Sequence, residues 1–168
     1  MTTSQPIEIY TDGSCSKNPG PGGWGCIVVD GNKVAAYGYR CKETTNNRME
    51  LYGLLKAMEH AAAHRSQRFS ILSDSAYCVN MCSSWIFGWA QNGWTTKDRK
   101  PVKNLDLVQR VYQNLADFPN FTITLVKGHA GVIGNELADA MATGNIERFT
   151  KICQQNKLKI IDCQYGEE

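Results

Sequence analysis

Two aspartates stand where strand-like runs end, and such positions can carry chemistry. Asp12 follows the short alternating apolar run 7–11, and Asp74 closes the run "RFSILSD". Because ligands of open α/β sheets usually bind beyond strand ends, neighbouring strands would bring these two carboxylates together. Each residue also has a simpler interpretation, since Asp12 could be a turn residue and Asp74 a helix N-cap.

Two further carboxylates lie in helical patterns. Glu50 falls near the direction of Leu54 and Ala57 on a 3.6-residue helix, which points its side chain toward the sheet. A lone carboxylate there is costly unless it is paired or bound to a metal. Asp139 lies in the short helical stretch "GNELADAMATGN", which a crossover could return to the same sheet edge.

Convergence of these four carboxylates without a basic partner would make them repel one another, and divalent cations would remove that repulsion. An all-oxygen ligand set suits Mg²⁺, and Mn²⁺ could substitute for it. Two such ions about 3.5–4 Å apart can hold both the attacking and the leaving oxygen of a phosphodiester displacement. The combination therefore predicts metal-dependent phosphoryl chemistry, although no single residue does.

The elements that must position these residues follow an α/β pattern. "WGCIVVDGNKVAAYGYRC" predicts two strands joined by a hairpin at 30–32. Apolar residues between 51 and 58 have the spacing of one helix face, and "NLDLVQRVYQNLADF" predicts another helix with Asn104 as its cap. Three strands, a helix, a strand, helices, a strand and a helix indicate a mixed sheet with helices packed on it.

The end of the chain leaves alternatives open. Ile146, Phe149, Ile152 and Cys153 would share one face of a further helix. The stretch "LKIIDCQY" would form either a last strand or an ordered tail.

Length and composition bound the class of protein. The 168 residues suggest one domain, and 42% hydrophobic with 20% charged residues is typical of a globular protein with its own core. The net charge of +2 does not by itself indicate nucleic-acid binding, so that argument needs local clusters. No run reaches bilayer length, and "MTTSQPIEIY" does not resemble a signal peptide, so we expect a cytoplasmic protein with no membrane partner. The sequence leaves the oligomeric state open, with a monomer as the default.

Other metal and nucleotide motifs fail their own tests. None of the seven cysteines forms a C-x-x-C pair, which favours free thiols over a zinc framework. His60 and His64 have i, i+4 spacing, but "HAAAH" lacks the glutamate of the H-E-x-x-H motif. "NPGPGG" lacks the G-K-[ST] of a nucleotide-binding P-loop.

Five motifs taken together resemble one family. "YTDGSCSKNPGPGGWG", "TTNNRMEL", "LSDSAY", "GWTTKDRKPVKNLDLVQR" and "VKGHAGVIGNELAD" follow one another in the order and spacing of type 1 ribonuclease H, over roughly residues 7–145. The resemblance implies an α/β fold with a five-stranded mixed sheet flanked by helices. It implies a catalytic domain over 1–145, with 146–168 as a C-terminal extension. The implied activity is endonucleolytic cleavage of the RNA strand of RNA–DNA hybrids, with little sequence preference.

The same resemblance assigns the catalytic residues. The family's four metal-binding carboxylates fall on Asp12, Glu50, Asp74 and Asp139, and its mobile histidine falls on His129. Two Mg²⁺ ions bound with the substrate would direct cleavage to products with 5′-phosphate and 3′-hydroxyl ends. His129 would help to position or protonate groups during attack and product release, because its imidazole can exchange a proton near neutral pH.

The resemblance also implies a surface for the hybrid. Backbone and amide groups around the glycine-rich loop would contact the shallow minor groove and the 2′-hydroxyls that distinguish RNA from DNA. Hydroxyl, aromatic and basic groups would hold the DNA strand through its phosphates and sugars. The groove contacts would be Gly13, Ser14, Asn18, Asn46 and Asn47, and the DNA-strand contacts would be Thr45, Trp85, Lys97, Lys100, Lys103 and Asn104.

Each of these contacts has an ordinary structural alternative. Asn46 and Asn47 could cap the helix that follows them, and the lysines could belong to a solvated surface. Core packing is favoured for Trp89, whereas Trp85 is the better candidate for a DNA contact.

Three stretches depart from the family pattern. Residues 90–92 read Ala-Gln-Asn where some members carry basic residues. Position 76 is Ala where some members have Gln, and Glu43 stands where some have Arg. These departures predict weaker binding of the hybrid but do not affect the four carboxylates.

Three rival functions are weighed against the hybrid nuclease. A metal-dependent DNA strand transferase is disfavoured by Asn18, Asn46 and Asn47 and by the lack of a recognisable DNA-targeting domain. A catalytically silent hybrid-binding protein is disfavoured because all four carboxylates and His129 are present. The third rival is a structural subunit of a larger complex, which one sequence does not test.

Overall fold

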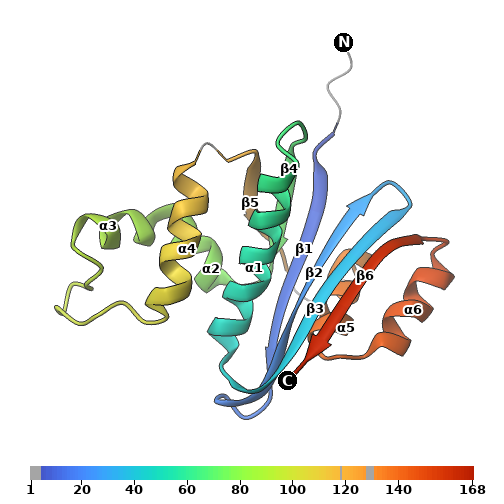
Figure 1. The fold of residues 1–168 in the computed structure, drawn as a ribbon, viewed down its shortest axis with the longest axis horizontal. Helices are drawn as coiled ribbons and strands as arrows, with labels where there is room; N and C mark the ends of the chain where they lie inside the picture. The colour runs from blue at the N-terminus through green and yellow to red at the C-terminus, as the bar shows by residue number, and fades with distance from the viewer. Residues whose placement is uncertain (1–4, 118, 128–130) are drawn as a thin grey trace.

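The structure is a computed structural model that describes residues 5–117, 119–127 and 131–168. In this part of the chain, one mixed sheet has the strand order β5-β4-β1-β2-β3-β6 (Figure 1). The first three strands form an antiparallel meander, and β4, β5 and β6 add to it by parallel pairing. The bounds are β1 Ile7–Cys15, β2 Gly20–Asp30, β3 Lys33–Thr44, β4 Phe69–Ser73, β5 Phe121–Leu125 and β6 Lys159–Glu167.

Helices cover both faces of the sheet (Figure 1). Helices α1 to α4 lie on one side, and α5 and α6 lie on the other. A π-helical turn, Met81–Trp85, joins α2 to α3. The bounds are α1 Asn46–Ala63, α2 Ala76–Asn80, α3 Ile86–Gln91, α4 Leu105–Ala116, α5 Ile133–Ala142 and α6 Ile146–Gln155.

The predicted α/β class and order of elements are confirmed, but the strand number is wrong. The sheet has six described strands instead of five, because the C-terminal segment forms both α6 and β6. Strand β6 pairs with residues 33–40 of β3 and satisfies backbone groups that would otherwise lie on an open sheet edge. The hairpin is confirmed, since Asp30 pairs with Lys33 and Gly31 has a positive φ of 61°.

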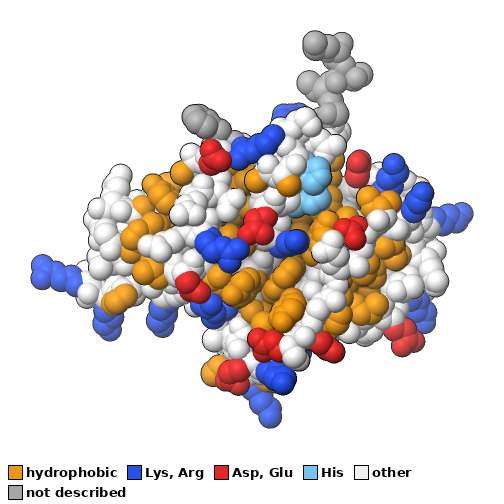
Figure 2. Space-filling model, in the orientation of Figure 1, with side chains coloured by type: hydrophobic (Ala, Val, Ile, Leu, Met, Phe, Trp, Pro, Cys, Tyr) orange, Lys and Arg blue, Asp and Glu red, His pale blue; other side chains and the backbone are white. Residues whose placement is uncertain are grey.

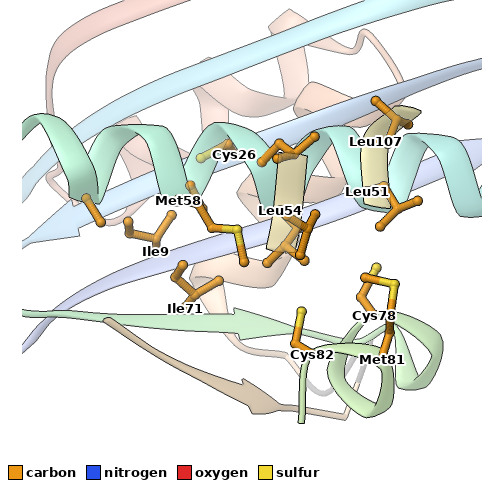
Figure 3. Packing of buried hydrophobic residues seen from close by; sticks show 14 of the residues in the cluster. Ile9, Cys26, Leu51, Leu54, Met58, Ile71, Cys78, Met81, Cys82 and Leu107 are labelled. Carbon is orange, nitrogen blue, oxygen red and sulfur yellow. The ribbon is translucent and has the colours of Figure 1, made fainter. Parts of the chain in front are cut away.

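The core on the α1 side explains why the helix is held firmly. Figure 3 shows Met58 and Leu54 of α1 near Ile9 of β1 and Ile71 of β4, with Leu51 further along the helix above Cys78 and Met81. Leu51, Leu54, Met58, Ile9 and Ile71 belong to one continuous core cluster. All five side chains are fully buried. Each such burial contributes about 1.5–3 kcal/mol, so the start of α1 is set against the sheet by several side chains at once.

A second core lies on the opposite face. It joins Ile27 of β2 to Leu137 and Met141 of α5 and to Phe149 and Cys153 of α6. Helix α6 is therefore part of the folded domain. Among the described residues, no helix is both long and apolar enough to cross a bilayer.

Candidate active site

Three carboxylates converge where the pairing of β1 with β4 ends. The parallel register closes at Thr11 and Ser73, so Asp12 and Asp74 are the next residues on two adjacent strands. Glu50 comes from the second turn of α1. One oxygen from each of the three carboxylates lies within 4.8 Å of the others.

The local alternatives for the two aspartates are wrong. Strand β1 continues past Asp12 to Cys15, and Asp12 pairs with Gly25 of β2, so Asp12 is not in a turn. The N-cap of α2 is Ser75, whose hydroxyl accepts a hydrogen bond from the Cys78 N–H at 3.2 Å. Neither carboxylate position is therefore explained by backbone capping.

Two glycines allow the helices to bring their carboxylates to β1. A Cβ atom at Gly13 would lie 2.4 Å from the backbone nitrogen of Glu50. A Cβ atom at Gly25 would lie 2.3 Å from the carbonyl oxygen of Ala138, next to Asp139. Real side chains do not tolerate such distances, so α1 and α5 can approach the sheet this closely only over glycine.

Asp139 sits at the side of this group and differs from its other members. It lies close enough to Asp12 to help raise the pKa of that residue, but it is outside the set of three oxygens described above. Its Oδ2 accepts a hydrogen bond from Nη1 of Arg148 at 2.7 Å. The other arm of Arg148 pairs with Glu136.

Burial and mutual repulsion favour the protonated forms of the central carboxyls. Burial, helped by the charges of Asp74 and Asp139, raises the pKa of Asp12 to about 8. Burial, helped by Asp12 and Asp74, raises the pKa of Glu50 to about 9. The Gly13 N–H, which donates to Asp12 Oδ1 at 2.9 Å, opposes both shifts.

The donor set fits a hard divalent cation. Within the described residues, Glu50 Oε2 is buried and has no hydrogen-bond partner, a costly state for a carboxylate oxygen. A cation shared with Asp12 and Asp74 would satisfy this oxygen and relieve the repulsion, and oxygen ligands suit Mg²⁺ or Mn²⁺.

The start of α1 carries the predicted groove contacts on its exposed side. Asn18 and Asn46 meet directly, because the Asn46 N–H donates to Asn18 Oδ1 at 3.0 Å. The capping alternative for Asn46 and Asn47 is wrong, since Thr45 is the N-cap and accepts from the Arg48 N–H at 3.3 Å. Both asparagine side chains are left exposed to solvent.

Asn104 does not cap α4 in the predicted way. It occupies the N-cap position with a left-handed φ of 58°, but its side chain makes no capping hydrogen bond. Instead, Asn104 Oδ1 accepts from Arg48 Nη1 at 3.4 Å. Arg48 also holds Asp106 with two hydrogen bonds of 3.0 and 2.8 Å, which ties the starts of α1 and α4 together.

A hollow beside α3 brings together three of the predicted DNA-strand contacts, Trp85, Lys100 and Lys103. Trp85 is 43% exposed, whereas Trp89 packs partly against the core, as expected. Figure 2 shows basic side chains at the edge of the molecule over the segment between α3 and α4, the segment that contains Lys97, Lys100 and Lys103. The hollow is lined by Tyr77, Trp85, Trp89, Thr96, Lys100, Pro101, Val102 and Lys103.

Two sequence-predicted contacts need separate mention. Gly13 and Ser14 lie in β1 instead of a loop, and the loop itself is short because β2 begins at Gly20. His129 lies outside the described residues.

The comparisons with known proteins agree with this fold. The sequence model of the RNase H family matches residues 4–147. A ribonuclease H from Ruegeria pomeroyi is 45% identical over 149 residues, which cover 85% of this chain and 94% of that protein. The crystal structure of LC9-RNase H1, a type 1 RNase H with the type 2 active-site motif, superposes with a TM-score of 0.68 at 30% identity, covering 86% of this chain and 74% of that one.

A more distant structure shares the fold. LC11-RNase H1, solved in complex with an RNA/DNA hybrid, has a TM-score of 0.59 at 22% identity and covers 84% of this chain and 97% of that one. The fold and its acidic cluster define a metal-dependent nuclease. The chain belongs to the ribonuclease H family.

Two arginines were missed by sequence reasoning. Arg48 stands inside the motif "TTNNRMEL", but its partners Asn104 and Asp106 come from a helix more than fifty residues away. Arg148 lies one residue beyond the family match. The signal that could have found it is "TGN" at 143–145, a short turn that folds α6 back against α5.

Proposed function

We propose that this protein is an endonuclease that hydrolyses the RNA strand of RNA–DNA hybrids by a two-metal mechanism, with little sequence preference. The products would carry 5′-phosphate and 3′-hydroxyl ends. The observation that carries the proposal is the convergence of Asp12, Glu50 and Asp74 with a buried, unpartnered Glu50 oxygen. Membership of the ribonuclease H family supports the choice of substrate.

The carboxylates would divide the work of holding two Mg²⁺ ions. Asp12 is central to the site. One of its oxygens lies within 4.8 Å of oxygens of Glu50 and Asp74, and its side chain also lies near Asp139. When bound, the ions would lower the pKa of the attacking water and stabilise the departing 3′ oxygen. The Gly13 N–H orients Asp12 by holding Oδ1, and the Thr45 cap and buried α1 face fix Glu50. From its place in the sequence, His129 would carry protons during attack and product release.

The surface around the carboxylates would tell RNA from DNA. Asn18 holds the first N–H of α1, so the two asparagines of the helix start, Asn46 and Asn47, are presented to solvent in a fixed position. With Gly13 and Ser14, they would contact 2′-hydroxyls and base edges in the minor groove.

A separate patch would hold the DNA strand. Trp85 offers an exposed ring for the sugar, and nearby lysines offer charge for phosphates whatever the base sequence. Thr45 and Asn104 flank Arg48 between these two areas.

The proposal places the catalytic domain at 1–145, with 146–168 as an extension that packs against it. The whole chain would act as a monomer.

The test uses one labelled strand in four duplexes: RNA–DNA, RNA–RNA, DNA–DNA, and DNA with a short embedded RNA stretch. Each is incubated with Mg²⁺, Mn²⁺ or EDTA, with Asp74→Asn as the matched inactive variant. We expect cutting of the RNA strand with 5′-phosphate ends, none in EDTA and none with the variant. Tight hybrid binding without cutting would overturn the proposal in favour of a silent binder.

A further inference from the structure

Arg148 connects the C-terminal extension to the acidic site. Its guanidinium pairs with Asp139 through Nη1 at 2.7 Å and with Glu136 through Nη2. Both carboxylates project from the same face of α5, three residues apart. The three side chains are only 26–34% exposed, so this is a partly buried cluster and not a surface ion pair.

The fold holds Arg148 in place from several directions. Helix α5 ends at Ala142, and Gly144, with a positive φ of 74°, turns the chain into α6. Asn145 caps α6 by accepting the Arg148 N–H at 3.0 Å. Phe149, the next residue, is buried in the core. The backbone at Arg148 is therefore fixed, and it places the guanidinium next to Asp139.

We propose that Arg148 is a positioning residue that sets the affinity of the Asp139 side of the site for its divalent cation. The proposal rests on the function proposed above. Arg148 occupies one oxygen of Asp139 and leaves the other for the cation. Its positive charge also opposes a second positive charge on the same carboxylate. The C-terminal extension would thus help to keep the metal-free site folded. It would also moderate the binding of the divalent cation, which shares the Asp139 carboxylate with Arg148.

The charge and the hydrogen bonds of Arg148 can be separated by substitution. Arg148→Gln keeps a donor near Asp139 but removes the charge, whereas Arg148→Lys keeps the charge. We expect Arg148→Gln to bind Mn²⁺ about fivefold more tightly in the absence of substrate, the order expected for removing one nearby charge. Arg148→Lys should stay within about twofold of the wild type.

The control is an arginine of similar type that lies away from the site. Arg110 Nη2 pairs with Glu59 at 2.7 Å between α4 and α1, and both side chains are 48% exposed. Glu59 is nine residues after Glu50, about 13 Å along the helix axis. Arg110→Gln should leave Mn²⁺ affinity unchanged, because this pair does not share a carboxylate with the site.

The experiment is a calorimetric Mn²⁺ titration of the full chain, followed by hybrid cleavage as a function of Mg²⁺ concentration. The Mg²⁺ concentration for half-maximal cleavage should fall by the same factor in Arg148→Gln. Combining Arg148→Gln with Asp139→Asn should reduce the effect below twofold, since the interaction acts through Asp139. An effect that persists in that background would instead reflect loosening of α6.

The outcomes separate this inference from the function on which it rests. If the wild type binds Mn²⁺ and cuts hybrids while Arg148→Gln binds with equal or weaker affinity, the inference is wrong and the function stands. If the wild type neither binds Mn²⁺ nor cuts hybrids, both are wrong. Circular dichroism of each variant shows whether the overall secondary structure is kept, and a folded Arg148→Gln with unchanged affinity decides against the inference.

Discussion

The two sides of the acidic site handle negative charge in opposite ways. On the α1 side, oxygens of Asp12, Glu50 and Asp74 lie within 4.8 Å of one another. Burial raises the pKa values of Asp12 and Glu50, helped by Asp74 and Asp139 for Asp12 and by Asp12 and Asp74 for Glu50. On the α5 side, Asp139 is paired with Arg148, a cation supplied by the protein itself. The first side depends on an external cation or on protons, whereas the second is already partly neutralised.

Unequal neutralisation of the two sides explains how the site can exist without metal and still bind it. Three ionised carboxylates at close range would destabilise the fold, and protonation of Asp12 or Glu50 limits that cost. A divalent cation must then displace those protons before it binds. Asp139 differs from these groups because the guanidinium of Arg148 already supplies a positive charge beside it.

The largest expected effects on cleavage come from two variants that each remove one carboxylate, Asp12→Asn on the α1 side and Asp139→Asn on the α5 side. Asp12→Asn should reduce cleavage roughly a thousandfold or more, because several kcal/mol of metal-dependent stabilisation are lost. The same change should raise the melting temperature of the metal-free protein, because it removes a buried repelling carboxylate. Asp139→Asn should also slow cleavage but lower that melting temperature, because the loss of a partner for the partly buried Arg148 outweighs the relief of repulsion between Asp139 and Asp12.

Thermal melting in EDTA and single-turnover cleavage check the comparison. Asp30→Asn, an exposed hairpin aspartate, is the control and should change neither quantity. Equal signs for the two melting shifts would show that the two sides do not differ as described. Normal cutting by Asp12→Asn would remove Asp12 from the metal site.

The pH dependence should be large on the α1 side. The folded pKa values of about 8 for Asp12 and about 9 for Glu50 exceed their ordinary values near 4, so the metal-free folded state binds more protons than the unfolded state between about pH 4 and pH 9. Its free energy of unfolding should therefore fall as the pH rises through that window. Mg²⁺ competes with these protons, so its affinity should rise over the same window.

Thermal melts with and without excess Mg²⁺, at steps of pH across the window, measure both trends. The shift in melting temperature caused by Mg²⁺ should grow with pH. A shift that stays constant from acid to alkaline pH would mean that the carboxyls do not exchange protons for metal.

A smaller effect should follow from separating the two sides without changing any charge. Gly25→Ala places a Cβ 2.3 Å from the Ala138 carbonyl oxygen, which forces α5 and Asp139 away from β1. We expect a loss of about 1–3 kcal/mol in the free energy of unfolding, together with weaker cleavage. Gly88→Ala is the control, since no atom would meet its Cβ and the helix should gain about 0.5–1 kcal/mol.

Urea unfolding of the two variants gives the free energies, and hybrid cleavage gives the functional cost. A Gly25→Ala protein as stable and active as the wild type would show that α5 can be shifted without disturbing Asp139. That result would remove the geometric link between the two sides.

Local patterns were enough to predict most of the fold. The spacing of Leu51, Leu54 and Met58 and the turn at 30–32 each depend on residues close in sequence, and both are present in the structure. The edge strand β6 could be left only as an alternative, because "LKIIDCQY" forms a strand by pairing with β3, more than a hundred residues away. Its register is set by that partner and not by its own composition.

The carboxylates of the site were predictable from the sequence, but the contacts that hold them in place were not. Asp12 and Asp74 mark strand ends that one can align from the sequence, and Glu50 shows its direction by helical phase. The sequence places Gly13 beside the glycine-rich loop and Gly25 in a predicted strand, and only the packing shows that they admit Glu50 and α5. For Arg148, the "TGN" turn at 143–145 indicates only that α6 folds back on α5, whereas its partners depend on the angle between these two helices.

The smallest predicted effect concerns a residue that belongs to neither side of the acidic site. Trp85 is exposed beside the lysine-lined hollow, so Trp85→Ala should weaken hybrid binding by about 1 kcal/mol, or roughly fivefold in KM. Its kcat, melting temperature and Mg²⁺ dependence should stay unchanged, because no carboxylate is touched. Phe87→Ala is the matched control, since Phe87 is 45% exposed on the same helical segment and contacts Tyr112 instead. Steady-state cleavage at several Mg²⁺ concentrations separates these effects. A changed Mg²⁺ dependence in Trp85→Ala would show that hybrid binding and metal binding are coupled. The metal affinity of the two carboxylate sides would then depend on the bound hybrid as well as on the protein.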